Sequence, residues 1–162
     1  MILLRRSFVI SGAAMVLLPG ASRAADTVSG KFIGNGKEAK LAFASAWVTD
    51  GMSGKQAVVV VMTEKDHSAS KRPTWDADFG EFGSALTISV HRPDGGIFSC
   101  QVRHEGLKRS PISVIGTIKP EGLSFDGDRL KARFTSKGPD KFFDDVFEVD
   151  VQVDAAIRPK LA

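Results

Sequence analysis

Residues 129–135 read RLKARFT and residues 143–153 read FDDVFEVDVQV, and these stretches are the clearest indication of the fold class. Apolar and polar residues alternate in each with a period of two, the pattern of a strand with one face in a core and one in solvent. The polar face of the first stretch is basic and that of the second is acidic: Arg129, Lys131, Arg133, Glu148, Asp150 and Asp154. We therefore predict an antiparallel pair, joined by one turn and crossed by ion pairs.

The same alternation recurs in about nine short segments, separated by turns rich in Gly, Pro, Asn and Asp. The segments are 28–33, 39–49, 57–62, 85–91, 97–104, 112–118, 123–125, 129–135 and 143–153. The continuous apolar run of 57–62 indicates a central strand buried on both faces. This spacing predicts an all-β fold, an antiparallel immunoglobulin-like β-sandwich, with a small β-barrel as the alternative.

The first 24 residues have the layout of an export signal. Arginines precede an apolar stretch, Phe8 to Leu18, and a small-residue site follows that suits cleavage after Ala24. The apolar stretch is too short to cross a bilayer, which takes about 20 apolar residues. We therefore predict an export signal peptide at 1–24 and a single soluble β-sandwich domain at 25–162, located in the periplasm or secreted. A retained helix anchored on the membrane is the alternative.

Residues 5–10, Arg-Arg-Ser-Phe-Val-Ile, resemble the twin-arginine export signal. The resemblance covers only the leader, and it departs from the usual pattern at Leu4, where Ser or Thr is common, and at Ile10, where Lys is often found. It implies that the domain engages the export machinery already folded. The general secretory route is the alternative.

The charge of the precursor does not describe the exported domain. The chain carries 22 Lys and Arg against 19 Asp and Glu. The leader holds three of the arginines and no acid, so the domain carries 19 of each sign and no net charge. A basic surface for nucleic acid is therefore not indicated, and we expect no nucleic-acid partner. Cys100 is the only cysteine, which excludes an internal disulfide, and we interpret it as a small buried hydrophobe.

The alternation stops at residues 64–83, the longest irregular segment. A short helix over 75–79, with Thr74 as its N-cap, is expected here. This otherwise polar segment contains three aromatic residues. Trp75 and Phe79 lie in the expected helix, and Phe82 follows it.

These aromatics either plug one end of the core or line a cleft for an apolar ligand or a partner. The candidate ligand-binding residues are three aromatics as contacts and two acids as polar partners: Trp75, Phe79, Phe82, Asp76 and Asp78. The acids, with Glu81, have the density of a Ca²⁺ site but lack its full loop pattern, so we interpret them as solvated loop acids.

The three histidines are the candidates for catalysis or metal ligation. Cys100 and His104 lie about 13 Å apart if both are in one strand, too far to share a metal ion. No Gly-x-Ser-x-Gly motif is present. We predict no cofactor, no metal site and no catalytic residue, and expect a binding or envelope-interaction module whose partner is a small apolar ligand or an envelope protein. The alternative is a small periplasmic hydrolase or metal-dependent enzyme that uses His67, His91 or His104.

Overall fold

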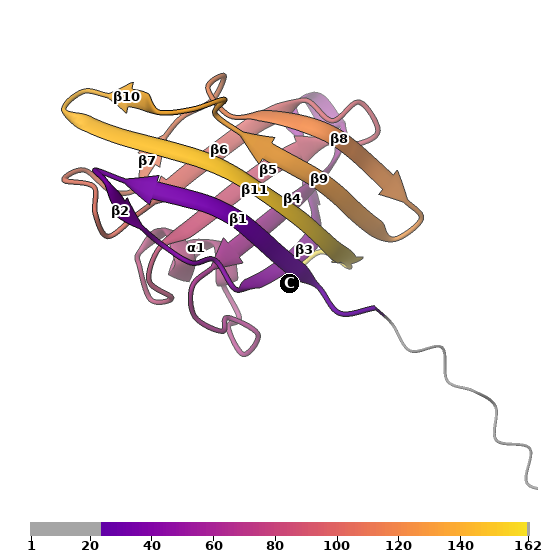
Figure 1. Ribbon diagram of the computed structural model, residues 1–162. Coiled ribbons are helices and arrows are strands. Elements are labelled where there is room, and N and C mark those ends of the chain that lie inside the picture. The colour runs from indigo at the N-terminus through magenta and orange to yellow at the C-terminus, as the bar shows by residue number, and fades with distance from the viewer. Residues whose placement is uncertain (1–23, 162) are drawn as a thin grey trace, which may run out of the picture.

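The computed structural model describes residues 24–161, so residues 1–23 of the predicted export signal lie outside the described residues. The described part contains eleven strands, one short α-helix and one 3-10 turn (Figure 1). They are β1 (Thr27–Gly34), β2 (Lys37–Glu38), β3 (Phe43–Asp50), η1 (Met52–Gly54), β4 (Gln56–Thr63), α1 (Pro73–Asp78), β5 (Ala85–His91), β6 (Ile97–Arg103), β7 (Ile112–Ser113), β8 (Lys119–Asp126), β9 (Arg129–Thr135), β10 (Asp140–Phe142) and β11 (Asp145–Arg158). The predicted all-β class is confirmed.

The strands form one continuous curled sheet, in the manner of a half-barrel. Its main path is β2-β1-β11-β3-β4-β5-β6-β7, while β9 pairs with the other edge of β11 and β8 pairs with β9. The long strand β11 joins the two halves, because its middle lies between β1 and β9 whereas Ile157 and Arg158 pair in parallel with β3. An immunoglobulin-like sandwich of two separate sheets is therefore not what the pairing shows.

A single core lies between the two halves of the curl. In Figure 1 the half built on β1, β9 and β11 lies in front of the half built on β3 to β6. The largest fully buried side chains come from both halves, among them Phe32, Phe134 and Phe147 from the first and Met62, Leu86 and Ile88 from the second. The apolar run at 57–62 is the central strand that the sequence predicts, buried between β3 and β5.

The predicted pairing of the basic and acidic strands is confirmed, but the connection between them is not one turn. Lys131 lies directly opposite Asp154, and Arg133 donates two hydrogen bonds to Asp150, at 2.7 and 2.8 Å. Between β9 and β11 the chain first forms β10, which folds back onto the start of β11.

Four predicted strands differ from the observed ones by more than one residue at an end. One of them is segment 143–153, because β11 runs from Asp145 to Arg158. Segment 39–49 is reduced to β3, preceded by the separate two-residue β2, and segment 112–118 is reduced to β7. Segment 123–125 extends to the whole of β8 through an irregularity between Glu121 and Ser124. A bulge at the edge of a sheet admits a proline and a glycine, which is why the predicted turn at 120–122 is part of a strand.

The end strands of the sheet are short or irregular. The end strands β2 and β7 of its main path have two residues each, and β8 carries Pro120 and the bulge. Because β2 pairs only with Ile33 and Gly34, residues 27–31 of β1 have a strand partner on one side only, β11. Over residues 24–161, neither helical element has the length and apolar composition needed to cross a membrane.

Candidate functional site

The helix α1 lies on the outer face of the strands β3 to β6. It begins at Pro73, whose fixed φ suits the first helical position, so the N-cap is Arg72 and the expected cap, Thr74, lies inside the first turn. Ala77 is fully buried against an apolar cluster on this face, formed with Trp47, Val59, Val61 and Ala85. This contact fixes the helix on the sheet.

The structure separates the three predicted aromatic contacts. The Trp75 and Phe79 side chains are 56% and 63% exposed, and their rings stack with centroids 4.6 Å apart. Phe82 instead points inward, against the apolar cluster below α1 and 5.9 Å from the ring of His67. The aromatics therefore neither plug the core together nor converge on one cleft.

The two predicted polar partners have different surroundings. Asp76 accepts a hydrogen bond from the Ser70 hydroxyl at 2.6 Å and lies 3.9 Å from the Arg72 guanidinium, so it stabilises its own loop. Asp78 Oδ1 is buried and makes no hydrogen bond of good geometry among the described residues, although the Thr87 hydroxyl lies close to the carboxyl group. Burial raises the pKa of the Asp78 carboxyl, and the Thr87 hydroxyl opposes part of the rise. Asp78 thus differs from Asp76 in that its carboxyl group is buried and its pKa is raised.

Asp78 lies at the wall of a hollow of about 380 Å³. Its floor is the outer face of β3 to β6, where the register places Trp47, Val59, Ser89 and Ser99 in one row and Ser45, Val61, Thr87 and Gln101 in the next. Thr74 and Asp78 of α1 and Lys160 and Leu161 of the C-terminal segment complete the lining.

The floor changes from apolar to polar across the sheet. Below α1 it is formed by Trp47 and valines, whereas on β5 and β6 the side chains are hydroxyls and an amide. Thr87 is only 6% exposed, and its Oγ1 lies close to the Asp78 carboxyl without a hydrogen bond of good geometry between them, so neither atom is fully satisfied by the described residues. A buried polar group without a partner is costly, and such groups gather where a ligand completes the hydrogen bonding. The hollow is therefore suited to hold a polar molecule.

The hydroxyl floor is the part of the site that was missing from the candidate residues. Alternation predicts Leu86, Ile88 and Val90 as the inner face of β5, which is confirmed, and so leaves Thr87 and Ser89 on the outer face. The available signal was that this outer face carries hydroxyls in place of charges. The pattern could not show that a helix from residues 73–78 covers it.

The three histidines lie in three separate surroundings. His67 is buried, with Nδ1 2.6 Å from the Thr63 hydroxyl. His91 stacks on Phe98 and accepts a hydrogen bond from the Met52 N–H at 3.1 Å. His91 pairs with Ala57 of β4, whereas His67 contacts Thr63 at the other end of the same strand. These two β4 residues are six positions apart, or about 20 Å along the strand, so the two histidines do not share a site.

His104 packs against Phe32 and accepts a hydrogen bond from the Gly106 N–H at 2.9 Å. Residues 24–161 contain no group of three His, Cys, Asp or Glu side chains arranged to hold a metal ion. The predicted burial of Cys100 is confirmed, and burial raises the pKa of its thiol to about 12.

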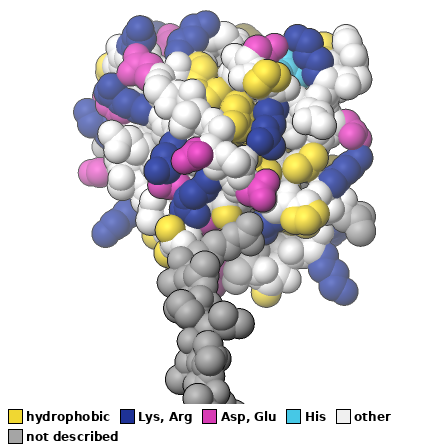
Figure 2. All heavy atoms as spheres, turned by 90° about the vertical axis from the view of Figure 1, so that its right-hand side faces the viewer, with side chains coloured by type: hydrophobic (Ala, Val, Ile, Leu, Met, Phe, Trp, Pro, Cys, Tyr) yellow, Lys and Arg dark blue, Asp and Glu magenta, His cyan; other side chains and the backbone are white. Residues whose placement is uncertain are grey.

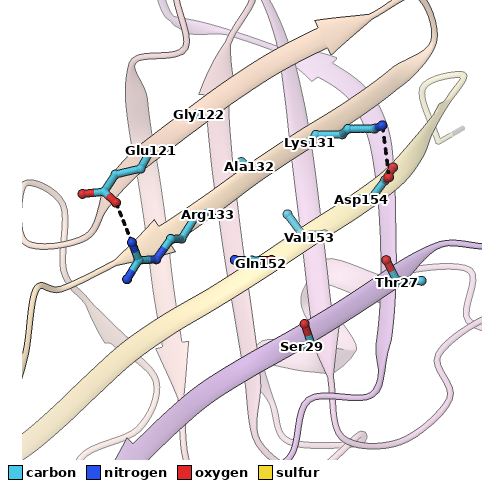
Figure 3. Close-up of a pocket in the computed structure, with 10 residues that line it drawn as sticks. All are labelled: Thr27, Ser29, Glu121, Gly122, Lys131, Ala132, Arg133, Gln152, Val153 and Asp154. Carbon is cyan, nitrogen blue, oxygen red and sulfur yellow. Dashed lines mark hydrogen bonds and ion pairs between the residues drawn. The ribbon is translucent and has the colours of Figure 1, made fainter.

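A second depression, on the outer face of β1, β11, β9 and β8, contrasts with the hollow (Figure 3). Its charged side chains pair with one another, Arg133 with Glu121 at 3.0 Å and Lys131 with Asp154 at 3.6 Å. The face in Figure 2 likewise intersperses Lys and Arg with Asp and Glu. Because these charges are paired or mixed, neither surface presents a single sign to a ligand.

The comparisons with known proteins add no relative to this picture. No protein-family model, no curated protein and no solved structure matches the chain. The geometry and chemistry of the hollow are therefore the basis on which a function is assigned.

Proposed function

We propose that this chain is an exported protein that binds a small polar ligand, without chemical conversion, in the hollow between α1, the β3–β6 face and the C-terminal segment. The observation that carries the proposal is that one hollow brings the Asp78 carboxylate together with the side chains of Thr87, Ser89, Ser99 and Gln101. Asp78 Oδ1 and Thr87 Oγ1 are buried there and lie close to each other without a hydrogen bond of good geometry. Pockets that bind small molecules combine a largely preformed concave surface with a few convergent polar groups. This hollow has both properties.

The lining defines the chemistry of the ligand. A carboxylate accepts hydrogen bonds, and hydroxyl and amide groups donate or accept them. A ligand must therefore offer at least one donor to Asp78 and further polar groups to Ser89, Ser99 and Gln101. Burial deprives the Asp78 carboxylate of hydrogen bonds to water, and a hydrogen-bond donor on the ligand replaces them. The site therefore selects ligands that carry such a donor. Export is supported by the leader at residues 1–24.

Titration of the ¹⁵N-labelled protein with glycerol and with acetamide tests the proposal. Both probes are expected to shift the amide resonances of Thr87, Ser89, Ser99 and Gln101. Thr87→Val keeps the shape of the side chain but removes its hydroxyl, and should weaken both effects. Thr117→Val, a change outside the hollow, is the matched control and should leave them unchanged. Shifts confined to other parts of the sheet, or no shift with either probe, overturn the proposal.

A further inference from the structure

The hollow continues into an apolar groove along the outer side of α1. This groove is lined by Lys71, Arg72, Thr74, Trp75 and Leu161, and it shares Thr74 and Leu161 with the hollow. On α1 itself, Asp78 is three residues beyond Trp75, so the carboxylate and the indole lie on neighbouring parts of one helix face. The two depressions therefore form one surface, with a polar end and an aromatic end.

Trp75 is exposed in a way that packing of the protein does not require. Its side chain is 56% exposed, and its one aromatic partner among residues 24–161 is Phe79, which is itself 63% exposed. The stacking at 4.6 Å orients the indole without burying it. Large exposed aromatics next to a polar depression are typical of surfaces that contact a ligand.

The ligand that fits both ends must be polar at its rim and apolar on a face. It must donate a hydrogen bond to Asp78 and exchange hydrogen bonds with the floor, and it must also present weakly positive C–H groups to the electron-rich face of an indole. A pyranose ring has this construction, with hydroxyls around its edge and C–H bonds on its faces. On the rim, Arg72 lies close to Asp76 and Lys160 pairs with Asp50, so the rim presents no single sign and suits a ligand without net charge.

We infer that the surface binds a saccharide of at least two rings, one stacked on Trp75 and the next with its hydroxyls in the hollow against Asp78 and Thr87. The inference rests on the proposed function and names its ligand class. The two ends differ in what they offer a ligand, because the exposed aromatic surface is at Trp75, whereas the hydroxyl, amide and carboxylate groups converge in the hollow. The linked rings gain affinity because the first ring brings the second to its site.

Titration with three neutral disaccharides, cellobiose, maltose and chitobiose, tests this inference in the full protein. At least one of them is expected to shift both the Trp75 indole N–H and the Ser99 and Gln101 amides, and to bind at least tenfold more tightly than glycerol. Trp75→Ala should weaken that disaccharide tenfold or more while leaving glycerol binding unchanged. Phe143→Ala removes an aromatic that is 70% exposed, in the turn between β10 and β11, and should have no effect.

The outcomes separate the two proposals. If glycerol binds in the hollow but no disaccharide binds more tightly than glycerol, or if Trp75→Ala has no effect, the saccharide inference is overturned and the proposed function stands. If neither glycerol nor a disaccharide shifts the hollow, both are overturned. A circular dichroism spectrum of each variant shows that loss of binding is not loss of fold.

Discussion

The side-chain amide of Asn35 donates a hydrogen bond to the buried carboxylate of Asp145 at 2.7 Å, across 110 residues of chain. Asp145 also accepts the backbone N–H groups of Lys108 and Arg109, at 2.8 and 2.9 Å. One carboxylate thus joins the turn after β1, the loop after β6 and the first residue of β11. These hydrogen bonds lower the pKa of Asp145 below its usual value of 3.8, and the bond from the Lys108 N–H has the largest effect.

Asp145→Ala is therefore expected to lower the midpoint of thermal unfolding, because it leaves donors from two loops without an acceptor. Asp144→Ala, an exposed neighbour of the same type, should have almost no effect. The stabilisation by Asp145 is present above pH 3.8 and is lost as the pH falls through the lower folded-state pKa. The difference between variant and wild type should thus shrink in acid. A difference that stays constant down to pH 2 would contradict this assignment.

His67 makes the protein sensitive to mild acid. The Thr63 hydroxyl donates to the Lys65 carbonyl at 2.7 Å, so His67 donates from Nδ1 to Thr63, and the buried Nε2 has no partner among the described residues. Burial lowers the pKa of His67 from 6.5, although Asp66 opposes the shift. The unfolded state then binds more protons below pH 6.5, and stability falls as the pH drops from there toward the folded-state pKa.

His67→Gln should flatten this part of the stability profile, whatever its effect at neutral pH. Burial also lowers the pKa of His104, so His104→Gln should flatten the same region independently. Urea unfolding measured from pH 5 to pH 8 gives both slopes. An unchanged slope in both variants would show that these rings do not titrate with folding.

Asp78→Asn is expected to stabilise the ligand-free protein at neutral pH. Burial raises the pKa of Asp78, so its contribution to stability falls as the pH rises from 3.8 through the folded-state pKa, and a neutral amide avoids this loss. Asp76→Asn should not stabilise, because Asp76 already has hydrogen-bonding partners. Thermal unfolding at pH 7 compares the two variants. Residues of a binding site often lower the stability of the ligand-free protein. A lower midpoint of thermal unfolding for Asp78→Asn than for the wild type would show that Asp78 does not.

Gly30 is the position in β1 where the approach of β11 excludes a side chain. Its φ is +124°, and a Cβ atom would fall on the Asp150 carbonyl oxygen. Gly30→Ala should therefore separate the two strands and destabilise the protein by more than the strain alone. Gly36→Ala also has a positive φ, +79°, but open space around it, so it should cost only about 1–2 kcal/mol. Chemical denaturation of both variants measures the difference, and equal costs would contradict the close approach.

Ile88 tests the single core. It is fully buried in the cluster shared by both halves of the sheet, so Ile88→Ala should cost about 2–5 kcal/mol. Ile115→Ala, at a site that is 57% exposed, should change stability by less than about 0.5 kcal/mol. Two unfolding transitions, with only one affected by Ile88→Ala, would show that the halves are separate units.

Local patterning predicted several strands closely and others poorly, for one physical reason. Segments 85–91 and 129–135 match β5 and β9 because side chains that alternate between core and solvent leave a period of two in the sequence. Segment 112–118 has a similar apolar content, but only its first two residues form a strand, because the chain turns after the Val114 N–H has donated to the Cys100 carbonyl, and the Thr117 N–H closes that turn on the Val114 carbonyl. The extent of a strand depends on the neighbouring strand with which it forms hydrogen bonds. The alternation of residues within one segment does not show which strand that is or how far it extends.

The candidate site divides in the same way. Residues 64–83 were predicted as the functional segment from their irregularity and aromatic content, and that segment supplies α1, Trp75 and Asp78. The grouping of Trp75, Phe79 and Phe82 was not reproduced, since helical spacing stacks the first two outside while Phe82 returns to the sheet. The residues that line the hollow together with Asp78 come largely from β5, β6 and the C-terminal segment, and no local sequence pattern connects these segments to α1.

The sequence by itself therefore determined the all-β class, the central buried strand, the core face of β5 and the burial of Cys100, because all of these follow from apolar periodicity and composition. Only the tertiary structure decided that β11 joins both halves of one curled sheet and that α1 closes a hydroxyl-lined hollow. The physical reason is that a sheet brings together residues far apart in the chain, through backbone hydrogen bonds that any sequence can form. The choice among such pairings is made by the packing of the whole core.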